Sequence, residues 1–217
     1  MKKNTLRTIV VGTALVAAVS VAGTAFAFGG YGRTSAAAPN AAAPGDATCV
    51  ISSVPSDADP SDLTPVEIAD LQYLREEEKL AHDVYTALYE QWGLRTFSNI
   101  AASEQRHTDA VEALLAAYGV EDDVDESALG QFEDDKLQAL YDELISRGSE
   151  SLASAIEVGI LVEKVDIADI DEQIANTSND AILQVYENLR SGSENHLSAF
   201  SKVYERFTDN SAEDVTL

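Results

Sequence analysis

The feature that most constrains the fold of this chain is a glutamate and a histidine three residues apart, Glu104 and His107, inside a helical apolar pattern. Residues three or four apart on a helix lie on the same face. The apolar residues that recur at those steps and share this face are Phe97, Ile100, Ala101, Val111, Leu114 and Tyr118. The segment from about 97 to 118 is therefore predicted to be a helix that points both polar side chains into a core.

A carboxylate that faces a core needs a partner, because burying an unpaired charge is strongly unfavourable. A metal ion is the simplest partner for Glu104 and His107. A solvated or hydrogen-bonded pair is the alternative, since this spacing arises easily by chance. The choice depends on whether other helices bring matching ligands to the same level.

A first helix is predicted from Pro65 to about Gln91, because Thr64 and Glu67 can form a capping box and Gly93 can end the helix. Its apolar face also carries a carboxylate. Glu78 is the residue expected to face inward, with Glu77 as the second choice, whereas Glu76 is expected to face water. His82 lies one turn beyond Glu78, and we expect it at the edge of this face with a surface hydrogen bond.

Two more helices are predicted, one from about 149 to 175 and one from about 178 to 207. The apolar face of the first carries Glu163 and Asp166; the alternative is that both flank a helix break and stay wet, since Asp has poor helix propensity. The apolar face of the second carries His196, for which a buried, hydrogen-bonded histidine is the alternative. Gly159 lies four residues before Glu163, and Gly192 lies four residues before His196. The two glycines indicate either close helix packing or a passage for a small oxidant.

An acidic connector between residues 119 and 148 carries one short amphipathic helix, from about 134 to 147. Such a connector is long enough to cross along the side of a helical bundle. The fold class predicted is therefore all-α, a four-helix bundle with a crossover connection that carries a short helix.

The four long helices together place four carboxylates and two histidines near their middles: Glu78, Glu104, His107, Glu163, Asp166 and His196. This number matches the carboxylate bundles that hold two iron ions. Oxygen and nitrogen ligands suit two iron ions, or manganese, better than a structural zinc ion. Because Cys49 is the only cysteine, no rubredoxin-like iron centre is encoded.

Several segments also resemble a known family. The stretches 75–85 (REEEKLAHDVY), 97–107 (FSNIAASEQRH), 165–170 (VDIADI) and 195–200 (NHLSAF) are similar to the DUF2202 family of ferritin-like proteins from archaea and bacteria. The resemblance covers about residues 65 to 207. It implies a ferritin-like bundle with a dinuclear metal centre, in a family without an assigned function. Position 82, usually Arg in that family, is His here.

Rubrerythrin is a better-known relative whose paired carboxylates on the third long helix resemble Glu163 and Asp166. By that analogy Glu78, Glu104 and His107 would bind one metal, and Glu163, Asp166 and His196 the other, with Glu104 or Glu163 bridging. Ser193 departs from the general pattern, because it stands where a second Glu-x-x-His would have its glutamate. Asp166 is expected to supply the missing charge.

The first 61 residues are expected to lie outside the folded domain. Residues 1–27 have a basic start, an apolar run and an Ala-Phe-Ala end, typical of a secretory signal peptide cleaved after Ala27, with an uncleaved membrane anchor as the alternative. Residues 28–61 are predicted to be a flexible Ala/Pro/Ser-rich linker, in which Cys49 is a free thiol or pairs between molecules. The ferritin-like domain is expected at 62–208 and an acidic tail at 209–217.

Charge limits the partners of this chain. The 38 acidic residues outnumber the 14 basic ones, so the formal charge is -24, and loss of the three basic residues in the signal segment takes it to -27. This charge argues against nucleic acid and anionic lipid as partners, since both need a basic surface. Self-repulsion favours a monomer or dimer, and the mature form is not expected to span a membrane.

Two functions from different classes fit these observations. The first is an exported redox protein that reacts with oxygen or peroxide, as ferroxidases and rubrerythrin-like peroxidases do. Its electrons would come from an external donor that the sequence does not identify. The second is a non-catalytic extracytoplasmic module that binds metal or serves as an interaction domain.

Overall fold

A computed structural model describes residues 58–208 and residue 215 of the chain. The described part is all-helical and contains no strand. Its elements are the 3-10 turn η3 (Pro60–Asp62) and the helices α1 (Pro65–Trp92), α2 (Arg95–Ala117), α3 (Asp135–Gly148), α4 (Leu152–Asn176) and α5 (Asp180–Thr208). None of these helices is long and apolar enough to cross a membrane. The signal segment, Cys49, most of the linker and most of the acidic tail lie outside the described residues.

The predicted helix ends are confirmed to within a few residues. The Thr64 hydroxyl accepts a hydrogen bond from the Glu67 N–H, and the Glu67 carboxylate accepts one from the Thr64 N–H, which is the capping box. Gly93 ends α1 with φ of 66°, and Gly119 follows α2 with φ of 64°, a backbone region that favours glycine.

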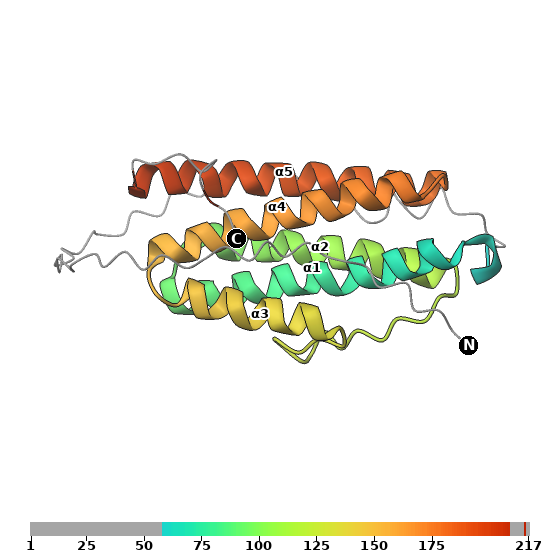
Figure 1. Cartoon of the computed structure of the whole chain (residues 1–217), viewed down its shortest axis with the longest axis horizontal. Helices are drawn as coiled ribbons and strands as arrows, with labels where there is room; N and C mark the ends of the chain where they lie inside the picture. The colour runs from blue at the N-terminus through green and yellow to red at the C-terminus, as the bar shows by residue number, and fades with distance from the viewer. Residues whose placement is uncertain (1–57, 209–214, 216–217) are drawn as a thin grey trace, which may run out of the picture. The chain divides into compact units, whose positions relative to one another are not determined.

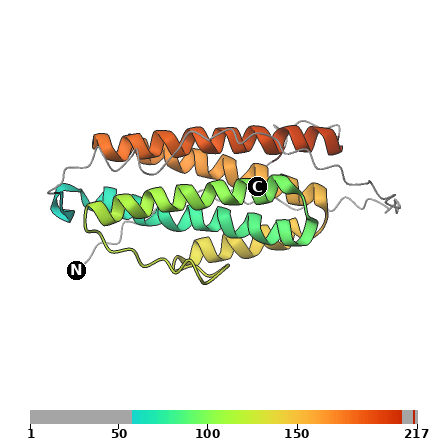
Figure 2. The same cartoon turned by 180° about the vertical axis from the view of Figure 1, so that it is seen from behind.

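The four long helices lie side by side, and the short α3 packs on α1 and α4 (Figure 1). Seen from behind, α2 covers α1 and leads into the connector of residues 118–134 that precedes α3 (Figure 2). The main partners are α1 with α2 and α4 with α5, while α1 also packs on α4 and α2 on α5. Each helix therefore has two long neighbours around a shared interior.

Two apolar clusters fill that interior, one on either side of a polar layer. One cluster includes Tyr85, Phe97 and Phe200, whose rings pack with centroids 5.1 to 6.2 Å apart. The other includes Leu74 and Leu189. Each long helix contributes residues to both clusters. The acidic and histidine side chains predicted as metal ligands lie between the two clusters. At Gly159 the structure favours close helix packing over a passage for an oxidant, because an added Cβ would lie 2.7 Å from the Phe200 ring.

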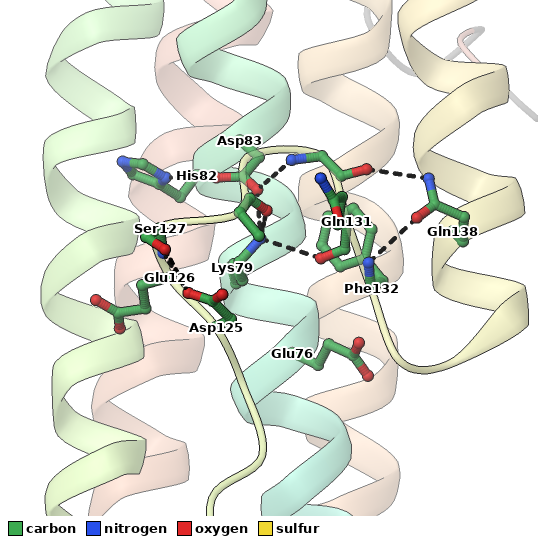
Figure 3. A network of polar contacts seen from close by, with 12 residues as sticks. Glu76, Lys79, His82, Asp83, Asp125, Glu126, Ser127, Gln131, Phe132 and Gln138 are labelled. Carbon is green, nitrogen blue, oxygen red and sulfur yellow. Dashed lines mark hydrogen bonds and ion pairs between the residues drawn. The ribbon is translucent and has the colours of Figure 1, made fainter.

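Helix α1 is buried on more faces than its periodicity predicts. Glu76 was expected to face water, but its side chain is 8% exposed and accepts hydrogen bonds from the backbone N–H groups of Glu133 and Asp134 in the connector. The prediction for Glu76 is wrong because the connector covers the outer face of α1, and Figure 3 shows Glu76 beside it.

Buried charges on α1 hold this connector in place. Lys79 donates hydrogen bonds to Asp83 Oδ2 (2.7 Å) and to the carbonyl oxygens of Ala128 (2.9 Å) and Gln131 (3.3 Å). Its ammonium also lies 4.6 Å from the centroid of the Phe132 ring. Figure 3 shows this network between α1 and the connector. These α1 charges are therefore structural and lie outside the polar layer of the interior.

Candidate metal centre

The structure brings five of the six predicted ligand residues into one buried layer. Glu78, Glu104 and Glu163 are each 1% exposed, and His196 is 8% exposed. The imidazole of His107 is 12% exposed. These side chains come from α1, α2, α4 and α5, so all four long helices contribute, as the sequence predicts.

Glu104 lies at the middle of this layer. Its Oε2 is 2.9 Å from His107 Nδ1, and its Oε1 is 2.8 Å from His196 Nδ1. The outer carboxylates approach the same two nitrogen atoms, with Glu78 Oε2 3.3 Å from His107 and Glu163 Oε2 3.5 Å from His196. The arrangement is a row in which each histidine faces Glu104 and one further carboxylate.

Two groups of ligand atoms result, each with all its members within 4.8 Å of one another. The first consists of Glu78, Glu104 and His107, and the second of Glu104, Glu163 and His196. Glu104 belongs to both groups, which is the position of a bridging carboxylate. Of the two bridging candidates from the sequence, the geometry favours Glu104.

The neighbours of the two imidazole rings determine which nitrogen faces the carboxylates. The rings of His107 and His196 stack with centroids 5.3 Å apart and an interplanar angle of 24°. At its Nε2 atom, His107 packs against Gly192, where an added Cβ would lie 2.5 Å away. The backbone of α5 therefore holds the His107 ring with Nδ1 toward Glu104.

Asp166 is buried in the same region but belongs to neither group of ligand atoms. It lies close enough to Glu78 and Glu163 for their charges to raise its pKa, after burial, which is the largest cause. Ser193, which is fully buried beside it, donates its hydroxyl hydrogen bond to Leu189 O at 3.1 Å. The alternative of a wet helix break is wrong, since α4 is continuous and both Glu163 and Asp166 are buried.

Tyr85 is a site residue that the sequence interpretation did not assign. Its hydroxyl donates a 2.6 Å hydrogen bond to Glu163 Oε1, and the residue is completely buried. Its place seven residues after Glu78, on the same inward face, was the available signal. Tyr85 fixes the orientation of Glu163 from the apolar side of the layer, in the manner of the outer hydrogen bonds that orient metal ligands.

Burial and mutual charge shift the pKa values of the carboxylates and imidazoles in this layer. Burial opposes charge on Glu104, but His107 and His196 lower its pKa below the usual range. Burial likewise opposes protonation of His196, yet Glu104 and Glu163 raise its pKa to about 10. Burial and the charge of Glu104 raise the pKa of Glu163 to about 7. Without a metal, protons on the imidazoles balance part of the negative charge.

A metal ion fits this set of donor atoms. Glu104 Oε1 and His196 Nδ1 are buried and 2.8 Å apart, yet neither has a hydrogen-bond partner of acceptable geometry. Glu78 Oε1 is also buried without a partner. Buried polar atoms are nearly always satisfied, so unpaired oxygen and nitrogen atoms that converge in one layer are a donor set that could bind a metal ion.

The remaining acidic and histidine candidates lie elsewhere. His82 is 24% exposed and its Nδ1 is 2.9 Å from Asp83 Oδ1, the edge position that was expected. Glu77, the second choice on α1, is buried but belongs to neither group. A third group of converging carboxylates, Asp109, Glu112 and Glu126, is exposed, and the Arg75 guanidinium lies 2.6 Å from Glu126 Oε1 and so neutralises part of its charge.

Comparisons with known proteins identify the family of this chain, and the descriptions of the family and of the relatives give no activity. Residues 67–212 match the family described as "Uncharacterized protein domain (DUF2202)". A relative, "Uncharacterized protein MJ0754" from Methanocaldococcus jannaschii, is 45% identical over 137 residues, which are 63% of this chain and 74% of the relative. The crystal structure of hypothetical protein MJ0754 from Methanococcus jannaschii DSM 2661 superposes with a TM-score of 0.66 and 41% identity, covering 70% of this chain and 91% of that one.

Proposed function

This chain belongs to the DUF2202 family, and we propose that it is an exported ferritin-like protein whose four-helix bundle binds two iron ions, or manganese, and reacts with oxygen or peroxide. The observation that carries the proposal is the position of Glu104, within 2.9 Å of one imidazole nitrogen on either side. A single carboxylate, Glu104, is shared between two histidines from different helices. This arrangement supports a dinuclear site, in which one carboxylate would serve both metal ions.

The donor set supports iron or manganese. Glu78, Glu104 and His107 would hold one ion, and Glu104, Glu163 and His196 the other. Among the ion pairs of the described residues, these three carboxylates are paired only with the two histidines and with no lysine or arginine. A mixed carboxylate and imidazole site suits these metals, which when bound supply one-electron chemistry toward oxygen or peroxide.

The side chains around this layer prepare it for that use. The Tyr85 hydroxyl orients Glu163, and the backbone at Gly192 orients His107. The aromatic cluster of Tyr85, Phe97 and Phe200 excludes water on one side. His107 and His196 keep slight exposure, so the layer is closest to solvent where α2 meets α5. A small oxidant would reach the centre at that seam, and electrons would come from an external donor.

The second candidate is a non-catalytic extracytoplasmic metal-binding or interaction module. The excess of acidic residues favours it, because a formal charge of -24 attracts cations whether or not they react. Both candidates need Glu104 and the two histidines as ligands. They differ in whether the bound metal turns over.

One assay separates the two candidates. Purified protein is loaded with ferrous iron under nitrogen, desalted and analysed for iron, and then mixed with hydrogen peroxide and a chromogenic reductant. Two iron ions per chain with peroxide-dependent oxidation support the redox protein. Less than one ion per chain and no turnover would favour the module.

A pair of histidine variants controls the assay. His107→Ala removes a ligand and should lower iron content and the melting temperature of the loaded protein together, since a metal that binds only the folded state stabilises it. His82→Ala changes a histidine outside the layer and should leave the iron content as in the unsubstituted protein. Full iron occupancy in His107→Ala would contradict the assigned site.

A further inference from the structure

Helices α1 and α2 leave a groove between them at the surface of the bundle. Its volume is about 420 Å³, and the residues that line it include His82 and Tyr89 from α1 and Ala101, Ala102 and Gln105 from α2. Hollows of about 300–1,000 Å³ are the usual size of sites for small organic molecules. The groove therefore has room for a small molecule that contains one ring.

His82 offers this groove a hydrogen-bond acceptor. Its Nδ1 lies 2.9 Å from Asp83 Oδ1, and Figure 3 shows Asp83 next to both Lys79 and His82. Asp83 accepts further hydrogen bonds from the Lys79 ammonium at 2.7 Å and from the Gly130 N–H at 2.9 Å. Because a carboxylate only accepts, His82 Nδ1 carries the proton and Nε2 keeps its lone pair. No hydrogen bond among the described residues uses this Nε2, so it can accept one from a hydroxyl group in the groove.

Gln105 and Tyr89 add a second acceptor and an aromatic surface. The Gln105 Nε2 donates to Asp109 Oδ1 at 2.9 Å and to Glu126 Oε2 at 3.3 Å, so the remaining polar atom of the amide is the acceptor Oε1. The side chain of Tyr89 is 40% exposed, which leaves its ring open to stack on another ring. The two alanines of α2 add only small apolar side chains. An aromatic ring that carries hydroxyl groups matches these features.

Charge restricts the ligand of this groove to neutral molecules. The lining residues include no lysine or arginine, and the chain has a formal charge of -24, so an anion would be repelled. They include no aspartate or glutamate either, so a cation would find no carboxylate to bind. The chemistry of the groove therefore indicates a neutral hydroxylated aromatic compound.

The groove lies close to the proposed metal centre. His82 follows the ligand Glu78 by about one helical turn on α1, and Ala101 precedes the ligand Glu104 by about one turn on α2. The separation between the groove and these carboxylates is therefore within about one helix diameter, 10–12 Å. A molecule in the groove can give an electron to the centre without entering the buried layer.

We propose that this groove binds a neutral hydroxylated aromatic compound that serves as the electron donor of the metal centre. The inference rests on the proposed function, because a donor is needed only if the centre reacts with an oxidant. Hydroquinone, the simplest such donor, reduces hydrogen peroxide to two water molecules and becomes benzoquinone. Its two O–H bonds and the O–O bond of peroxide break, and two electrons and two protons pass from hydroquinone to the two new water molecules. His82 Nε2 accepts each proton as the electron leaves the ring and releases it to solvent.

Binding of hydroquinone to the metal-free protein tests the groove without any turnover. An NMR titration of isotope-labelled protein should show one bound molecule per chain and shifts of the amide signals of the lining residues. p-Xylene, which has a similar shape but no hydroxyl groups, should bind about tenfold more weakly, because two hydrogen bonds are lost. His82→Ala should weaken the binding of hydroquinone and leave that of p-xylene nearly unchanged.

A pair of leucine variants controls this test. Ala102→Leu fills the groove from an exposed position of α2 and should weaken hydroquinone binding about tenfold or more, because its side chain occupies the space of the ring. Ala116→Leu is the same change at an exposed position of α2 outside the groove and should have no effect. In iron-loaded protein, Ala102→Leu should raise the KM for hydroquinone by a similar factor. Its iron content, and the rate at which peroxide oxidises the iron before any donor is added, should stay unchanged.

The outcomes distinguish this inference from the proposed function. Equal binding of hydroquinone and p-xylene, or equal hydroquinone binding by the two leucine variants, would overturn the donor site and leave the metal centre in place. Bound hydroquinone that is not oxidised while peroxide oxidises the iron would overturn its role as the donor. Unsubstituted protein that holds less than one iron ion per chain and does not react with peroxide would overturn the proposed function itself.

Discussion

Gly192 packs so closely against His107 that a methyl group at Gly192 would lie 2.5 Å from the imidazole Nε2. The contact holds the opposite nitrogen, Nδ1, 2.9 Å from Glu104 Oε2. We expect Gly192→Ala to displace the His107 ring and to weaken metal binding about tenfold to a hundredfold, the effect of losing an orienting contact to a ligand. Iron or Mn²⁺ titration measures the change.

Gly159→Ala is the control for this substitution. An added methyl there would meet the Phe200 ring at 2.7 Å, inside the aromatic cluster and away from the ligand nitrogens. Overpacking of a core costs about 1–3 kcal/mol, so this variant should melt earlier, and its loss of metal affinity should be smaller than that of Gly192→Ala. Equal losses of affinity in the two variants would mean that Gly192 acts through general packing rather than through His107.

Most of the fold follows from local signals in the sequence. The helices follow from the apolar period of residues such as Leu74, Leu88, Phe97 and Leu114, and the capping box at Thr64 marks where one of them begins. These features depend on neighbours in the chain. Glu76 could not be predicted. Its burial depends on a connector more than fifty residues away, which covers a helix face that periodicity alone assigns to solvent.

The candidate site was predictable as a set of residues but not as a geometry. Helix periodicity predicts that Glu78, Glu104 and His196 face inward, because the apolar face of a helix can be identified from the sequence of that helix alone. Whether Glu104 or Glu163 is shared, and whether Asp166 joins a group, depends on the rotation of one helix against another. The Tyr85 hydroxyl bond to Glu163 depends on that rotation as well.

The metal-free protein should lose stability as the pH rises. In the folded state the pKa of Glu163 is raised from 4.5 to about 7, by burial and by Glu104, and that of His196 from 6.5 to about 10, where Glu104 and Glu163 outweigh burial. Both groups thus bind protons more tightly in the folded chain than in the unfolded one. Their stabilisation is complete below the unfolded values and is lost as the pH passes through the folded values.

Thermal melts of chelator-treated protein between about pH 5 and 10 test this expectation. Each extra bound proton changes the free energy of unfolding by about 1.4 kcal/mol per pH unit, so the melting temperature should fall by several degrees. Metal-loaded protein should respond in the opposite direction across the lower part of this range, because metal binding displaces protons. A flat profile for the metal-free protein would show that these groups do not gain protons on folding.

Tyr85→Phe should weaken the metal centre from outside the ligand set. The 2.6 Å hydrogen bond that orients Glu163 is lost, and Glu163 Oε1 remains buried without a donor. We expect the metal-free protein to lose about 1–3 kcal/mol of stability, and metal affinity to fall about tenfold or more. Urea unfolding and metal titration measure the two effects.

Tyr204→Phe is the matched control, since its hydroxyl also donates to a carboxylate, Glu157 Oε1, at 3.1 Å. Glu157 is not a member of either ligand group. This variant should therefore change stability slightly and metal affinity not at all. Equal affinities in the Tyr85 and Tyr204 variants would remove Tyr85 from the site.

Lys79→Met tests the buried charges that hold the connector of residues 118–134. The substitution keeps an unbranched side chain over Phe132 but removes the ammonium from Asp83 and from two connector carbonyl groups. Breaking a buried ion pair by removing one partner costs about 3–5 kcal/mol, so urea unfolding should show a loss of that size, and limited proteolysis should cleave first in the connector.

Lys202→Met, at an exposed position of α5, should show neither effect. Because Lys79 contacts no proposed ligand, metal content at a temperature where the variant is folded should stay unchanged. A loss no larger than that of Lys202→Met would mean that apolar packing alone holds the connector on α1.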